Sequence, residues 1–123
     1  MRIKRSRLKT YYLRSALKQK DEEGNSFIEY GPPHSFSAEA WPGGGKVQAE
    51  IYGQRLPYIW NLRIDGAYQE IVQPDGHVAY CVGSSIFQEN DGICLHVGAD
   101  KNPDFRIISI RPYRFLKLEV ERI

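Results

Sequence analysis

The sequence has 123 residues, of which 26% are charged and 41% hydrophobic, and its formal net charge is +2 at pH 7. This length is ordinary for one domain, which should bury roughly two-thirds of the surface of its unfolded chain. No apolar run approaches the ~18 residues that are needed to cross a bilayer, and we therefore expect no membrane-spanning segment.

The N-terminus carries charge but no apolar segment of signal-peptide length, and we therefore expect the protein to stay in the cytoplasm. Two cysteines, Cys81 and Cys94, are too few for a disulfide framework and lack the spacing of a metal site. We expect both to pack as buried or half-buried thiols.

The charge is unevenly distributed along the chain. Residues 1–20 hold eight basic side chains and no acidic one, whereas residues 21–123 hold nine basic and fifteen acidic ones, a net charge of −6. The basic segment is compatible with a solvated terminus, with a contact to an acidic protein partner, and with a contact to a phosphate backbone. The sequence leaves these three interpretations open.

The first predicted element is a β-hairpin. The turn signal Asp-Glu-Glu-Gly-Asn at residues 21–25 separates a segment around Tyr11, Tyr12 and Leu13 from residues 26–30. A helix over residues 7–19 is the alternative, because several side chains fall near helical spacing. They are Leu8, Tyr11, Tyr12, Ser15 and Ala16.

A strand and a long loop follow. Phe36, Ala38 and Ala40 alternate with polar residues up to Trp41, whereas residues 42–57 show no sustained apolar alternation and open with three glycines. Because loops longer than ~12 residues in compact domains are usually functional or disordered, we expect this one to be functional. The segment Gly-Gly-Gly-Lys at 43–46 lacks the spacing of a phosphate-binding loop, and we expect a flexible joint that does not lead into a helix.

The second half of the chain alternates with a period of two. Tyr58, Trp60, Leu62 and Ile64 are expected to face the core, with Asn61, Arg63 and Asp65 on the other face. After a turn at residues 74–76, further strands are expected at 78–82, 93–97, 105–110 and 116–120. In the last one, Leu116, Leu118 and Val120 alternate with Lys117, Glu119 and Glu121.

These elements predict an all-β fold, a small antiparallel β-barrel or sandwich with one long projecting loop and room for a short helix. A single domain should cover residues 1–123, with a basic N-terminal arm at 1–9 and the long loop at 42–57. The histidines His34, His77 and His96 have no metal-site spacing. We therefore expect no enzyme activity, no metal and no cofactor.

Three segments support a resemblance to a known family. They are residues 21–25 of the first hairpin, residues 36–45 with their aromatic and small side chains before a Pro and Gly turn, and residues 102–113 together with the final strand. In order and spacing the chain resembles the head-tail joining, or head-closure, proteins of tailed bacteriophages. It is similar in particular to relatives in defective, phage-like elements of Bacillus.

The resemblance implies a structural virion-assembly protein. Such proteins are small antiparallel β-barrels that assemble as a ring beneath the portal and adaptor rings, retain packaged DNA with a loop in the channel, and dock the tail. The partners implied are the adaptor or portal ring, a tail-side terminator protein, further copies of the chain and, without sequence specificity, the packaged DNA. The implied location is the host bacterial cytoplasm during assembly and then the head-tail junction of the virion.

The resemblance also assigns roles to residues. The loop at 42–57 becomes the channel loop, with Lys46 and Arg55 facing DNA, Glu50 opposing it, and three glycines that permit rearrangement, Gly43, Gly44 and Gly45. Val47, Ile51 and Tyr52 are expected to pack between neighbouring subunits. The arm is expected to dock on an acidic patch of an adjacent ring through its basic side chains, Arg2, Lys4, Arg5 and Arg7.

A second function of a different class is a single-stranded nucleic-acid-binding barrel of the OB type. Aromatic side chains on strands beside a basic arm favour it, because bases stack on such platforms. The net acidic charge of residues 21–123 argues against it.

Overall fold

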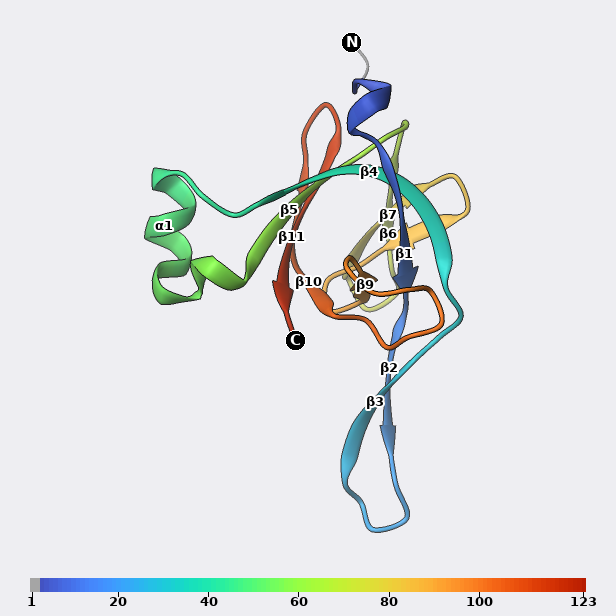
Figure 1. Cartoon of the computed structure of the whole chain (residues 1–123). Coiled ribbons are helices and arrows are strands. Elements are labelled where there is room, and N and C mark those ends of the chain that lie inside the picture. Colours follow the sequence, from blue (N-terminus) through green and yellow to red (C-terminus); the bar gives the residue numbers. More distant parts are fainter. Residues whose placement is uncertain (1–2) are drawn as a thin grey trace.

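The computed structural model describes residues 3–123 and contains a closed antiparallel β-barrel (Figure 1). Six strands form the barrel in the order β1-β4-β5-β11-β10-β9, and β9 pairs again with β1. The strands are β1 Lys9–Arg14, β4 His34–Pro42, β5 Ile59–Ile64, β9 Gly92–Cys94, β10 Phe105–Pro112 and β11 Leu116–Arg122. The predicted all-β barrel is confirmed.

The barrel encloses one apolar core. The alternating side chains of β11 that were expected to face inward, Leu116, Leu118 and Val120, are completely buried. Leu62 and Ile64 of β5 lie against them, as the alternation predicted. Phe87 also fills the core, and its ring packs edge-on against Phe36 with centroids 5.1 Å apart.

Phe87 reaches the core from a small three-stranded sheet outside the barrel. This sheet consists of β6 Gln69–Val72, β7 Val78–Val82 and β8 Ser85–Phe87. The turn predicted at Pro74-Asp75-Gly76 joins β6 to β7, and Gly76 has the positive φ of 91° that favours glycine there. Strands β6 and β8 were not predicted from the sequence.

The first hairpin projects from the barrel (Figure 1, blue). It consists of β2 Ala16–Lys20 and β3 Ser26–Tyr30, which pair only with each other. The hairpin prediction is therefore confirmed, and the alternative helix over residues 7–19 is wrong. Arg14 fixes the base of the hairpin, because its Nε donates to the Gly31 carbonyl at 2.7 Å and its Nη1 to the Lys101 carbonyl at 2.8 Å.

The segment at 42–57 is not the irregular loop that the sequence predicted. After Gly45 the chain forms helix α1, Lys46–Tyr52, and then the 3-10 helix η2, Gly53–Tyr58. The expectation that the glycines do not lead into a helix is wrong. Gly45 and Gly53 flank α1 with φ values of 85° and 55°, so glycine at both positions permits the sharp changes of direction.

Strand β5 begins one residue later than predicted, at Ile59. Tyr58 is exposed rather than part of the core, and the buried side chain is Ile59. Asn61 lies on the outward face as predicted but is almost fully buried. The reason is that the segment from Gly43 to Tyr58 covers this outward face of the barrel, as the 2.7 Å bond from the Gly43 amide to the Ile59 carbonyl illustrates.

Residues 3–8, which precede β1, lie at one end of the barrel in Figure 1. Ile3 is buried, and the 3-10 helix η1, Arg5–Arg7, precedes β1. Within residues 3–123, no helix is long and apolar enough to cross a bilayer.

Candidate functional site

Helix α1 leaves two large apolar side chains exposed. Val47 and Ile51 lie one helical turn apart and are 69% and 53% exposed. The one buried residue of the helix is Gln48, a polar side chain that is 8% exposed. This is the reverse of the usual amphipathic pattern, in which a surface helix buries its apolar stripe.

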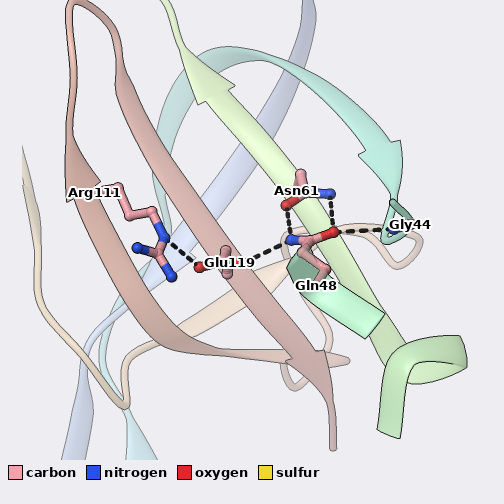
Figure 2. A network of polar contacts seen from close by, with 5 residues as sticks. All are labelled: Gly44, Gln48, Asn61, Arg111 and Glu119. Carbon is pink, nitrogen blue, oxygen red and sulfur yellow. Dashed lines mark hydrogen bonds and ion pairs between the residues drawn. The ribbon is translucent and has the colours of Figure 1, made fainter. Parts of the chain in front are cut away.

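The Gln48 side chain holds α1 against the barrel (Figure 2). Its Nε2 donates to Asn61 Oδ1 and to Glu119 Oε2, each at 2.6 Å. Its Oε1 accepts from the Gly44 amide at 3.0 Å and from Asn61 Nδ2 at 3.2 Å. Both donor hydrogens and both acceptor sites of the amide are therefore used.

Glu119 is the charged centre of this network and is only 1% exposed. The sequence placed it on the outward face of β11, which is correct, but not in a buried position. Arg111 of β10 donates from Nε to Glu119 Oε1 at 2.7 Å. The carboxylate thus has an ion-pair partner on one oxygen and Gln48 on the other, as buried charges require.

The surroundings shift the pKa values of this cluster. Burial raises the pKa of Glu119, but the hydrogen bonds from Gln48 and Arg111 and the positive charges of Arg111 and Lys117 lower it, and the net shift is downward. Burial, followed by the Glu119 charge, raises the pKa of Tyr52. At neutral pH Glu119 is therefore ionised and Tyr52 is neutral.

A groove of about 330 Å³ lies beside this network, between α1 and the barrel. Val47 and Ile51 line it on the helix side, and Trp41 lies on the opposite side. Its basic lining residues are Lys46, Arg111 and Lys117. The Trp41 ring lies 5.5 Å from the Arg63 guanidinium carbon and 6.0 Å from Lys117 Nζ, within the range of cation–π contacts.

The expected DNA-facing residues have different surroundings. Arg55 binds Glu121 with two hydrogen bonds, at 2.6 and 2.8 Å, and lies over the Tyr52 ring. Lys46 and Glu50 are exposed and form no ion pair within residues 3–123. Of the three glycines that were expected to permit rearrangement of the loop, Gly44 and Gly45 are exposed, whereas Gly43 packs against Ile59.

The residues that were expected to pack between subunits differ in their exposure. Val47 and Ile51 are exposed and available for contact, but Tyr52 is half-buried between α1 and the barrel. In the basic arm, Lys4, Arg5 and Arg7 are exposed, and Arg7 Nη1 pairs with Glu39 Oε1 at 3.5 Å. Arg2 lies outside the described residues.

The cysteines and histidines do not assemble into a site in the described part of the chain. Cys94 is buried and Cys81 half-buried, as expected, and neither forms a disulfide. His77 Nδ1 lies 2.8 Å from Asp75 Oδ2 on the surface. No three potential metal ligands come together among residues 3–123.

Comparison of the chain with family models, with curated proteins and with solved structures finds no match. The candidate site therefore rests on the residues and geometry of this chain.

The Gln48 network was not predicted, although the sequence contains a signal for helix α1. Residues 46–52 form a run without Gly or Pro that includes the good helix formers Lys, Gln, Ala and Glu. Val47 and Ile51 also have the spacing of neighbours on a helix. The pairing of Asn61 with Glu119 on adjacent strands could not be recognised without the register.

Proposed function

We propose that this chain is a structural assembly protein of a tailed phage or prophage, one that forms a head-tail connector ring. The ring retains packaged DNA and docks the tail. The observation that carries the proposal is the reversed helix α1, which buries a glutamine and exposes Val47 and Ile51. An isolated seven-residue helix is unstable in water, so an apolar partner that covers Val47 and Ile51 would stabilise it.

A second projecting element supports the same conclusion. The hairpin β2–β3 extends from a different side of the barrel than α1 does (Figure 1), and it also exposes apolar side chains, Leu17, Phe27 and Ile28. A subunit with two unlike contact surfaces associates head to tail, and such contacts generate a closed ring when the rotation permits closure. The resemblance of residues 21–25, 36–45 and 102–113 to head-closure proteins gives the ring its proposed place.

Electron microscopy of particles from a host prophage that lacks this gene tests the proposal. We expect separate tails, together with heads that have lost their DNA. Supplying the intact gene in trans should restore joined particles, whereas an Ile51→Glu variant should not. Gln54→Glu is the matched control, since it adds the same charge at an exposed position of η2. Normal joined particles in the deletion strain would contradict the connector function.

The alternative function, a single-stranded nucleic-acid-binding barrel, has one observation in its favour. Trp41 lies within cation–π distance of both Arg63 and Lys117, beside a groove with further basic residues. Such a surface can stack a base and neutralise its phosphate. A titration of the isolated protein with a labelled oligonucleotide decides this: tight, salt-dependent binding supports the alternative, and its absence leaves the assembly function.

A further inference from the structure

The hairpin β2–β3 lacks a packing partner within the described chain. Its residues from Leu17 to Glu29 are all exposed, and its strands pair only with each other. A two-stranded hairpin alone is marginally stable in water, and it needs a third strand or an apolar surface to pack against. The hairpin is therefore expected to be ordered by a contact outside its own barrel.

One face of the hairpin carries apolar side chains. In the register of β2–β3, Leu17 lies opposite Glu29 and Phe27 lies opposite Gln19. Because side chains alternate along a strand, these four share one face. Leu17 and Phe27 are 50% and 47% exposed. This face combines two large apolar side chains with one carboxylate.

The turn of the hairpin adds negative charge. The Asp21 carboxylate organises the turn by accepting from the amides of Glu23 and Asn25, at 3.0 and 2.8 Å. The carboxylates of Glu22 and Glu23 extend from this turn, and neither forms an ion pair within residues 3–123. The turn therefore presents two acidic side chains at the tip of the hairpin, whereas Lys18 and Lys20 lie on the face opposite to Leu17 and Phe27.

The groove beside α1 has the complementary properties. Val47, Ile51 and Trp41 supply apolar surface, and Lys46 and Lys117 supply positive charge. In one copy the hairpin points away from α1 (Figure 1), so the hairpin of a copy does not occupy its own groove. Every copy therefore carries both the hairpin and the groove, and the two do not contact each other within one copy.

We propose that the Leu17 and Phe27 face of the hairpin of one copy docks into the α1 groove of a second copy. Glu22 and Glu23 then approach Lys46 and Lys117, which fixes the orientation of the contact. The inference deepens the proposed ring by naming its subunit interface, and it rests on the proposed function only for the place of that ring in the particle. The contact is head to tail, so each copy gives its hairpin to one neighbour and receives the hairpin of the other.

Crosslinking between two different single-cysteine variants tests this contact. Phe27→Cys and Ile51→Cys are prepared separately in a Cys81→Ser background, where the remaining native thiol, Cys94, is buried. The two proteins are mixed at about 1 mM, a concentration at which even a weak contact is populated, and treated with a short bismaleimide. We expect covalent dimers in the mixture well above the background of random encounters, and only that background in either variant alone.

The matched control replaces the hairpin cysteine by Gln69→Cys, an exposed position on β6. The test pair should give about tenfold more dimer than the control pair, because a tenfold ratio requires only ~1.4 kcal/mol of attraction. Glu22→Lys with Glu23→Lys in the hairpin variant should abolish this excess. Lys46→Glu with Lys117→Glu in the groove variant should then restore it.

Three results would overturn the proposal. The first is dimer formation no greater than in the control pair. The second is crosslinking of the Phe27→Cys variant with itself, which would indicate a symmetric contact between hairpins. The third is tight binding of a labelled oligonucleotide that Lys117→Glu abolishes, which would assign the groove to nucleic acid.

The two proposals fail separately. Loss of the hairpin–groove crosslink, together with separated heads and tails in the deletion strain, would leave the connector function in place with a different subunit interface. A specific crosslink combined with normal particles in the deletion strain would establish the interface and remove the connector function.

Discussion

One isosteric substitution, Gln48→Glu, adds a second carboxylate to the Gln48 network beside Glu119. It replaces the amide nitrogen that lies 2.6 Å from Glu119 Oε2 by a carboxylate oxygen. Two unit charges about 3 Å apart repel by about 5 kcal/mol at an effective dielectric constant of ~20. Because Glu119 is 1% exposed, water screens this repulsion poorly.

Protonation of one carboxyl limits the destabilisation that this repulsion causes. One carboxyl of the pair can bind a proton at pH 7, and with an ordinary pKa of ~4.3 this costs about 3.7 kcal/mol. The protonated carboxyl can again donate a hydrogen bond to its neighbour, which returns about 1 kcal/mol. We therefore expect the Gln48→Glu variant to be about 3 kcal/mol less stable than the unaltered protein at pH 7.

The pH dependence has a defined sign. The carboxyl pair of the folded variant has a raised pKa and holds a proton that the unfolded chain lacks, so its stability increases as the pH falls from 7 toward 5. In the unaltered protein the pKa of Glu119 is lowered, and its contribution to stability is lost at lower pH, as the pH falls below ~4.3.

Urea denaturation followed by circular dichroism at pH 7, 6 and 5 measures both effects. Gln54→Glu is the control, because it adds the same charge on η2 at an exposed position and should change stability by no more than about 0.5 kcal/mol. Equal stabilities of the two variants at pH 7, or parallel pH profiles, would refute the assignment of Gln48 as the residue that holds α1 on the barrel.

Two further substitutions test the barrel. Gly92→Ala should destabilise the protein by about 2 kcal/mol in thermal or urea denaturation, since a Cβ there would overlap the Pro103 ring, whereas a Cβ at Gly44 meets no atom within 4 Å and Gly44→Ala should be nearly neutral. Burial raises the pKa of Asp91, partly offset by the hydrogen bond from the Ala16 amide. The unaltered protein should therefore gain stability relative to Asp91→Asn as the pH falls from 7 toward 4, and a pH-independent difference in unfolding free energy would contradict this.

The barrel was predictable because its strands follow a simple rule. Leu116, Leu118 and Val120 alternate with polar residues, and a period of two places them on one face whatever the neighbouring strands are. The same rule placed Asn61 and Glu119 on the outer face correctly. It could not predict that they are buried there, since burial of an outward face depends on a segment that lies elsewhere in the sequence.

Helix α1 was missed for a related reason. Residues 46–52 include good helix formers, but seven residues are too few for a helix to form from its own propensity, and the three preceding glycines favour a loop. The helix forms on the barrel because Gln48 finds Asn61 and Glu119, two residues that the register of β5 and β11 brings together. Tertiary contact overrides the local preference at this position.

The order of strands in the barrel constrains how the chain can fold during synthesis. Strand β1 is made first, but its partner β9 follows about eighty residues later, and β5 must wait for β11. Contacts between residues so distant in sequence form slowly, and an unclosed barrel exposes strand edges to aggregation. A ribosome-bound chain that lacks β11 leaves a gap between β5 and β10, so closure of the barrel is a late event that follows translation of Leu116–Arg122.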